Sequence, residues 1–93
     1  MLKTKRVKFH KVEGGQTLKE IADAYAVAES LLAKANGLKT APRKGQILRI
    51  PTETGNAYFV KEGDTKTLLF GDDKAFEKKN GTDAFYIGMR VIL

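Results

Sequence analysis

The sequence predicts an α+β fold of two tandem βααβ modules, each a two-stranded antiparallel sheet packed on two helices. Three observations predict it. A helical apolar stripe follows a short strand pattern near the N-terminus, a second strand pattern follows at residues 45–51, and the whole arrangement recurs about 48 residues later. Because two-stranded sheets are marginal alone, the helices must supply most of each core.

The first predicted helix has a well-defined start. Apolar residues recur at i, i+3, i+4 and i+7 from Leu18 to Tyr25, which places them on one helical face. Thr17 followed by Glu20 is a capping box that satisfies free N–H groups of the first turn. A helix start also leaves backbone N–H groups available to a ligand, so a structural and a binding role for Thr17 both stay open.

A second short helix and a returning strand complete the first module. The apolar stripe continues through Val27–Ala35, and Asn36-Gly37 supplies the left-handed residue that commonly ends a helix. Residues 45–51, GQILRIP, alternate as a β-strand does, and Pro51 ends that strand.

Together these residues resemble the LysM domain. Three sequence departures stand out: His10 where the family often has Tyr, Gln16 where it often has Asp, and Ala28 where it often has Ser. The matching positions are Val12, Gly15, Thr17, Leu18, Ile21, Ala22, Tyr25, Val27, Leu31, Leu32, Asn36, Gly37, Leu38, Gly45, Gln46, Leu48, Ile50 and Pro51.

The pattern recurs in the second half of the chain. Tyr58, Val60, Gly63, Asp64 and Thr65 repeat the spacing of the first module's opening at an offset of 48. The later landmarks recur at 44 (Asn80-Gly81) and 43 (Gly88), so about four residues are missing between the helices. The sequence therefore predicts a second, degenerate LysM-like copy, and this organisation: a basic lead-in (1–9), a first module (10–51), a linker (52–57) and a second module (58–93).

The elements of the second copy follow from this alignment. We expect a shortened helix at about Thr65–Phe70, a second helix through Ala75–Lys79 and a final strand at Met89–Leu93. By analogy with the first copy, Val91 and Leu93 should face inward.

The resemblance implies a carbohydrate-binding module that recognises N-acetylglucosamine-containing glycans, namely peptidoglycan or chitin, and that targets or anchors a protein to the cell wall. The alternative is a structural or assembly module of the spore-coat or phage-tail type, with no sugar binding.

In the family, the sugar lies between the strand-to-helix and helix-to-strand loops. The implied ligand-binding residues are Gly15, Gln16, Thr17, Leu18, Gly37, Leu38, Lys39, Thr40 and Ala41 in the first copy and Gly63, Asp64, Thr65, Lys66, Gly81, Thr82, Asp83 and Ala84 in the second. We expect the first copy to bind better, because Lys66 and Thr82 replace its apolar Leu18 and Leu38.

Charge is unevenly distributed along the chain. The first 51 residues hold eleven Lys or Arg and four Asp or Glu, a net charge of +7, and the remainder holds six and seven, a net charge of −1. The basic half could attract an anionic wall polymer or could simply be a solvated surface. Nucleic acid is not the expected partner, because the sequence has no recognition-helix pattern, aromatic RNA-binding motif or zinc-ligand spacing.

The sequence does not predict an enzyme, a metal site or a cofactor; catalysis would need a domain outside these residues. The chain lacks Cys, and its single His, His10, occupies a strand position where a packed structural ring is expected. Asp72-Asp73 resembles a loop or a helix cap more than a metal site, since one carboxylate pair does not make a calcium loop. Among the aromatic residues, Phe59, Phe85 and Tyr86 fit core or intermodule packing better than a sugar platform.

Two features bear on location. No apolar run approaches the roughly 20 residues of a membrane helix, so no membrane partner is expected. The basic N-terminus lacks the apolar centre of a secretion signal. A cell-wall or spore-envelope location therefore requires that the chain be part of a longer exported protein or reach the envelope by another route; a cytoplasmic location also stays open.

Overall fold

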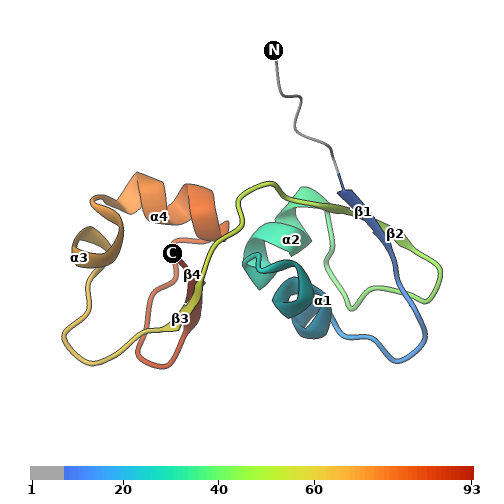
Figure 1. The fold of residues 1–93 in the computed structure, drawn as a ribbon, viewed down its shortest axis with the longest axis horizontal. Coiled ribbons are helices and arrows are strands. Elements are labelled where there is room, and N and C mark those ends of the chain that lie inside the picture. Colours follow the sequence, from blue (N-terminus) through green and yellow to red (C-terminus); the bar gives the residue numbers. More distant parts are fainter. Residues whose placement is uncertain (1–7) are drawn as a thin grey trace, which may run out of the picture.

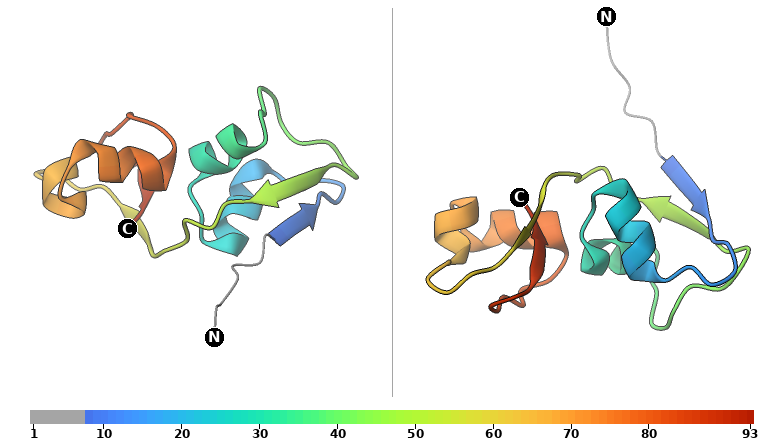
Figure 2. Two further views of the ribbon diagram at one scale, coloured as in Figure 1. Left: turned by 90° about the horizontal axis from the view of Figure 1, so that it is seen from above. Right: turned by 60° about the horizontal axis from the view of Figure 1, so that its bottom comes forward.

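A computed structural model describes residues 8–93, which form two βααβ units in succession (Figures 1 and 2). The N-terminal unit, residues 8–51, contains β1 (Lys8–Lys11), α1 (Leu18–Tyr25), α2 (Glu29–Ala35) and β2 (Ile47–Ile50). The C-terminal unit, residues 57–93, contains β3 (Ala57–Phe59), α3 (Lys66–Phe70), α4 (Asp73–Asn80) and β4 (Arg90–Ile92). Each unit has one antiparallel two-stranded sheet. The predicted α+β fold is confirmed.

The core of the N-terminal unit lies between its sheet and its two helices. The inward residues of β2, Leu48 and Ile50, meet the buried face of α1, where Ile21 and Ala22 are fully enclosed. Leu32 of α2 completes this cluster. The apolar stripe predicted from residue spacing is thus the packed face of α1, and its burial stabilises both helices on the sheet.

The core of the C-terminal unit is smaller and centres on one aromatic ring. Phe76 of α4 is fully buried and packs against Val60 and Val91. Phe70 and Phe85 contact it edge-to-face, with ring centroids 5.0 and 5.4 Å away. Edge-to-face pairs at such distances add stabilisation beyond the apolar area they bury.

The internal repeat in sequence is also a repeat in hydrogen bonding. Asn36 accepts a hydrogen bond from the amide of Arg49 at 2.7 Å and donates to the carbonyl of Arg49 at 2.8 Å. Asn80 makes the same exchange with Ile92, at 2.8 and 3.2 Å. In each unit one asparagine therefore ties the end of the second helix to the returning strand. The predicted shortening is also observed, because α1 has eight residues and α3 has five.

The two units touch through α2 and α4 and through one arginine of β4. Arg90 forms an ion pair with Asp23, Nε to Oδ1 at 2.8 Å, and its Nη1 donates to the carbonyl of Val27 at 3.0 Å. A Cβ on Gly81 would lie 2.5 Å from the Cα of Leu31, so only glycine fits this close approach. These contacts hold the C-terminal unit against the α1–α2 end of the N-terminal unit.

Two predicted boundaries need correction. Residues 1–7 of the basic lead-in lie outside the described residues, but Lys8 and Phe9 already belong to β1, opposite Ile50 and Arg49. Strand β1 begins two residues earlier than predicted because β2 extends to Ile50, so that Lys8 and Phe9 also have pairing partners. The linker is one residue shorter than predicted, because Ala57 pairs with Ile92 and so belongs to β3.

The prediction for the final strand is partly wrong. Val91 is buried as expected, but Leu93 is 41% exposed and Ile92 is fully buried instead. Gly55 of the linker explains the difference, because a Cβ at this position would contact the Ile92 side chain at 3.0 Å and the Leu93 carbonyl. The linker therefore covers the outer face of this strand, which a two-residue alternation alone would leave in solvent.

Packing of the surface aromatics was also only partly predicted. Phe85 packs on Phe76 as expected. Phe59 and Tyr86, however, are 59% and 61% exposed. Phe59 faces outward beside Arg90 in the strand register, and Tyr86 lies in the turn before β4, so neither reaches a core.

Candidate functional site

The strand-to-helix loop of the N-terminal unit, Gly15–Leu18, is largely occupied by its own hydrogen bonds. Thr17 caps α1: its Oγ1 accepts from the amide of Glu20, and its own amide donates to the Glu20 carboxylate, both at 3.2 Å. The amide of Gln16 donates to the carbonyl of Glu13 at 3.2 Å. The capping box is confirmed, and it leaves Thr17 and Gln16 with fewer groups for a ligand than the sequence suggested.

The sequence departures at His10 and Gln16 form one contact. His10 Nε2 and Gln16 Oε1 are 2.9 Å apart, and His10 Nδ1 lies 2.8 Å from the hydroxyl of Tyr25. At the corresponding positions of the C-terminal unit, Tyr58 donates to Asp64 Oδ2 at 2.6 Å. A His–Gln pair thus replaces a Tyr–Asp pair and keeps the strand tied to the loop. His10 is the structural ring that the sequence predicted.

The Tyr58–Asp64 contact shifts the pKa values of both side chains. The hydrogen bond from the Tyr58 hydroxyl lowers the pKa of Asp64, and the amide of Lys61, which donates to the same oxygen at 2.8 Å, lowers it further. The same hydrogen bond raises the pKa of Tyr58 above its usual value. The ionised carboxylate and the neutral phenol are therefore the favoured pair.

The C-terminal unit should lose stability at both extremes of pH. Because the pKa of Asp64 is lowered by folding, its contribution is present above the ordinary value of about 4 and is lost as pH falls through the lowered value. Because the pKa of Tyr58 is raised, its contribution is present below about 10 and is lost as pH rises through the raised value. Urea unfolding followed by NMR should show that Asp64→Asn flattens the acid side of this profile. An unchanged acid profile in that variant would contradict the assignment.

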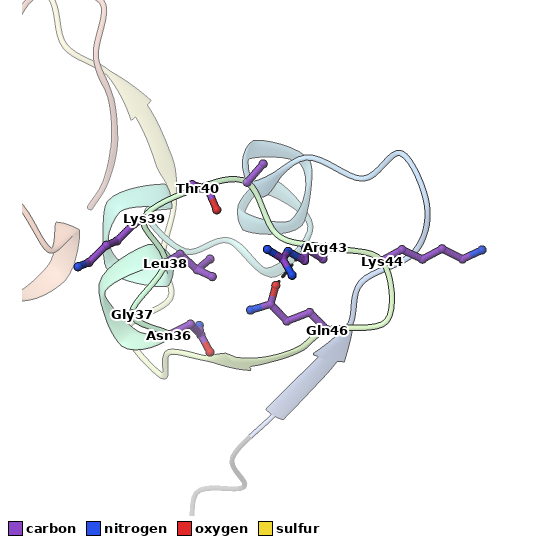
Figure 3. A pocket seen from close by; sticks show the side chains of 9 residues that line it. Asn36, Gly37, Leu38, Lys39, Thr40, Arg43, Lys44 and Gln46 are labelled. Carbon is purple, nitrogen blue, oxygen red and sulfur yellow. Dashed lines mark hydrogen bonds between the residues drawn. The ribbon is translucent and has the colours of Figure 1, made fainter.

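The helix-to-strand loop of the N-terminal unit borders a hollow of about 480 Å³ (Figure 3). We call it the Leu38 hollow. It is lined by Asn36, Gly37, Leu38, Lys39, Thr40, Ala41, Arg43, Lys44 and Gln46. Its size lies within the usual range of small-molecule sites.

Each of the two predicted loops places one apolar residue against the core. Leu18 and Leu38 are both half-buried and pack against the same core cluster. The Leu38 hollow takes in the whole predicted segment Gly37–Ala41, but its other wall is residues 43–46 rather than Gly15–Leu18. The sequence analysis did not assign a binding role to Arg43, Lys44 or Gln46. The match of Gln46 to the LysM pattern was the one signal pointing there.

The corresponding loops of the C-terminal unit, 63–66 and 81–84, are bridged by a side chain. Lys66 Nζ donates to the carbonyl of Asp83 at 2.6 Å and lies 5.1 Å from the ring centroid of Phe76. Thr82 Oγ1 accepts from the amide of Ala84 at 3.1 Å, within the second loop. Lys66, at the position equivalent to Leu18, therefore joins the two loops of this unit.

Other kinds of site find little support among residues 8–93. That part of the chain has no cluster of three His, Asp or Glu side chains that could hold a metal ion. Asp72 Oδ1 accepts from the amide of Ala75 at 2.6 Å and so acts as a helix cap, as predicted. No helix in the described segment has the length and apolar character needed to cross a membrane.

The N-terminal unit is a small α+β module with a hollow beside its helix-to-strand loop. The family model of the LysM domain matches residues 10–51, almost the whole of the N-terminal unit. LysM domains bind glycans such as peptidoglycan and are not catalytic domains, so the match agrees with a non-enzymatic role for these residues. The matched segment ends before the C-terminal unit begins.

Comparison with solved structures finds the crystal structure of the Bacillus cereus spore cortex-lytic enzyme SleL. The sequences are 22% identical and the TM-score is 0.47. The match covers 95% of this chain and 23% of that one, so the chain spans less than a quarter of the enzyme's length. A comparison with curated proteins finds no match.

Proposed function

We propose that the N-terminal unit binds N-acetylglucosamine-containing glycans in the groove between Leu18 and the Leu38 hollow. The observation that carries this proposal is that the Leu38 hollow lies entirely within residues 10–51, the segment matched by the LysM family model. Peptidoglycan is the expected natural polymer, and chitin fragments are its soluble neutral analogues. The protein would thereby be anchored to a cell wall or spore envelope.

Recognition would rest mainly on uncharged groups. The backbone of Gly37–Ala41 presents N–H and C=O groups that can pair with acetamido groups and hydroxyls. Leu18 and Leu38 are half-buried, so their remaining apolar surface can contact methyl groups and sugar faces. With few converging groups, affinity for a short oligomer should be modest, and a polymeric ligand would raise it through effective concentration.

We further propose that the C-terminal unit is a degenerate LysM-like copy whose groove is closed. Its hydrogen-bond pattern repeats that of the N-terminal unit at the asparagine and at the strand-to-loop contact. Lys66, however, already donates to Asp83, at the place where a ligand's amide would donate. Gly63–Lys66 and Gly81–Ala84 are therefore expected to contribute less to binding than their counterparts.

Titration of ¹⁵N-labelled protein with a chitin tetramer tests both proposals. The amide resonances of Gly15–Leu18 and Gly37–Ala41 should shift first. The affinity should change by no more than about twofold between roughly 0.05 and 0.5 M NaCl, because the ligand is uncharged. Shifts confined to residues 63–66 and 81–84 would reverse the assignment of the site. No shift with chitin or with soluble peptidoglycan fragments would favour the alternative of an assembly module without sugar binding.

A further inference from the structure

The Leu38 hollow is basic. Three of its lining residues are cationic, Lys39, Arg43 and Lys44, and none is acidic. The ion pairs found within residues 8–93 join Asp23 to Lys19 and to Arg90, so no carboxylate in that range lies within 4.0 Å of these three cations. Each keeps its full charge available to an outside partner.

Arg43 is the cation that lies in the middle of the hollow. Figure 3 shows the Arg43 side chain directed into the middle of the hollow, between Leu38 and Gln46, while Lys39 and Lys44 extend away from it on opposite sides. The backbone of Arg43 is fixed by two hydrogen bonds. Its amide donates to Gln46 Oε1, and its carbonyl accepts from the Gln46 amide, both at 3.0 Å. The guanidinium therefore starts from an ordered turn, which lowers the entropy cost of using it.

The fold does not require an arginine here. The same turn closes in the C-terminal unit, where the amide of Met89 donates to the carbonyl of Tyr86 at 3.1 Å. At the internal offset of 43, Tyr86 occupies the place of Arg43 and Ile87 that of Lys44; at the offset of 44, Asp83 replaces Lys39. The second unit thus builds the same loop without the cations. The cations of the Leu38 hollow are therefore not needed to form this turn.

We propose that Arg43 is a specificity residue that favours amino-sugar polymers carrying a carboxylate over neutral ones. This inference rests on the proposed glycan function. A guanidinium presents a planar fork of N–H donors that matches a carboxylate with two parallel hydrogen bonds, and such charge-assisted bonds are about twice as strong as neutral ones. The carboxylate could belong to a lactyl substituent on the sugar or to a peptide attached there, since both offer the same acceptor.

Calorimetry with matched tetrasaccharides tests the proposal. One ligand is the neutral N-acetylglucosamine tetramer. The other three alternate N-acetylglucosamine with N-acetylmuramic acid. The first carries a free lactyl carboxylate, the second an amidated lactyl group and the third a short stem peptide. At low salt the native protein should bind at least one carboxylate-bearing ligand about tenfold tighter than its amidated form. Which of the two carries the preference identifies the source of the carboxylate.

The variants then assign this preference to one side chain. Arg43→Gln should bring the carboxylate and amidated ligands to within about twofold of each other, and the carboxylate ligand should lose more affinity than the neutral tetramer. Arg43→Lys should keep only part of the preference, because it retains the charge and loses the fork. Arg49→Gln is the matched control: it removes the same charge from an exposed position on β2 outside the hollow, and the preference should survive.

Three results would overturn the inference. Equal weakening of neutral and carboxylate ligands by Arg43→Gln would make Arg43 a general contact. Loss of the preference in Arg49→Gln would show that the preference depends on the net charge of the protein and not on Arg43. Native protein that binds the neutral tetramer but shows no preference would refute the role of Arg43 while leaving the glycan function intact. Native protein that binds none of these ligands would instead contradict the glycan function on which the inference rests.

Discussion

Replacing Phe76 with alanine is expected to unfold the C-terminal unit at room temperature. Phe76 is fully buried and contacts Phe70, Phe85, Val60 and Val91. Truncation of a buried Phe to Ala typically costs about 3–5 kcal/mol. A folded domain has only about 0.05–0.15 kcal/mol of stability per residue, so a unit of this size holds a total comparable to that loss. In an ¹⁵N NMR spectrum, the resonances of residues 57–93 should collapse toward random-coil positions.

The N-terminal unit should stay folded in this variant, because its core contains no residue of the Phe76 cluster. Tyr86→Ala is the matched aromatic control. Its ring is 61% exposed, so the change in unfolding free energy should stay within about 0.5 kcal/mol. A dispersed C-terminal spectrum for Phe76→Ala with an unchanged thermal midpoint would show that this ring is not the centre of the core. Loss of both units together would show that they fold as one.

Replacing Leu38 with aspartate is expected to abolish measurable glycan binding. The new carboxylate would face the sugar in the Leu38 hollow without a matching donor on a neutral ligand. An unpaired charge buried against a ligand costs about 2 kcal/mol or more, which corresponds to at least about thirtyfold in Kd. Calorimetry with the chitin tetramer provides the measurement, and circular dichroism establishes that the variant remains folded. Retention of affinity would remove Leu38 from the site.

A milder variant separates binding from folding, because Leu38 also packs against the core. Leu38→Thr introduces the residue that the C-terminal unit has at the equivalent position, Thr82, so the loop should accept it. Its affinity should fall between those of the native protein and Leu38→Asp. Changing Lys3, Lys5 and Lys8 together removes three charges from the basic N-terminal segment and should matter much less. If that triple change abolishes binding and Leu38→Asp does not, the groove proposal is wrong and the basic segment is the active surface.

The sequence alone determined the parts of the fold that depend on near neighbours along the chain. The apolar spacing from Leu18 to Tyr25 predicted α1, and the Thr17–Glu20 capping box predicted its start. The repeat of Asn36-Gly37 at Asn80-Gly81 predicted the second pair of helices and its shortened first member. The spacing and the capping box act within one or two turns of chain, where residue type largely fixes the backbone, and the repeat carries the same local patterns to a second segment. The segment Gly37–Ala41 was singled out by a different route, because the resemblance to the LysM domain implied it.

Tertiary structure decided what those local patterns left open. It paired His10 with Gln16 and so turned two sequence departures into one preserved contact. Beside Leu38 it placed Arg43 rather than the predicted wall of Gly15–Leu18, and it aimed Arg90 at Asp23 in the other unit. These outcomes depend on how loops and units are oriented in space. An alternating or helical pattern in the sequence does not describe that orientation. Burial of Ile92 instead of Leu93 has the same cause, because the covering residue, Gly55, comes from a linker more than thirty positions away.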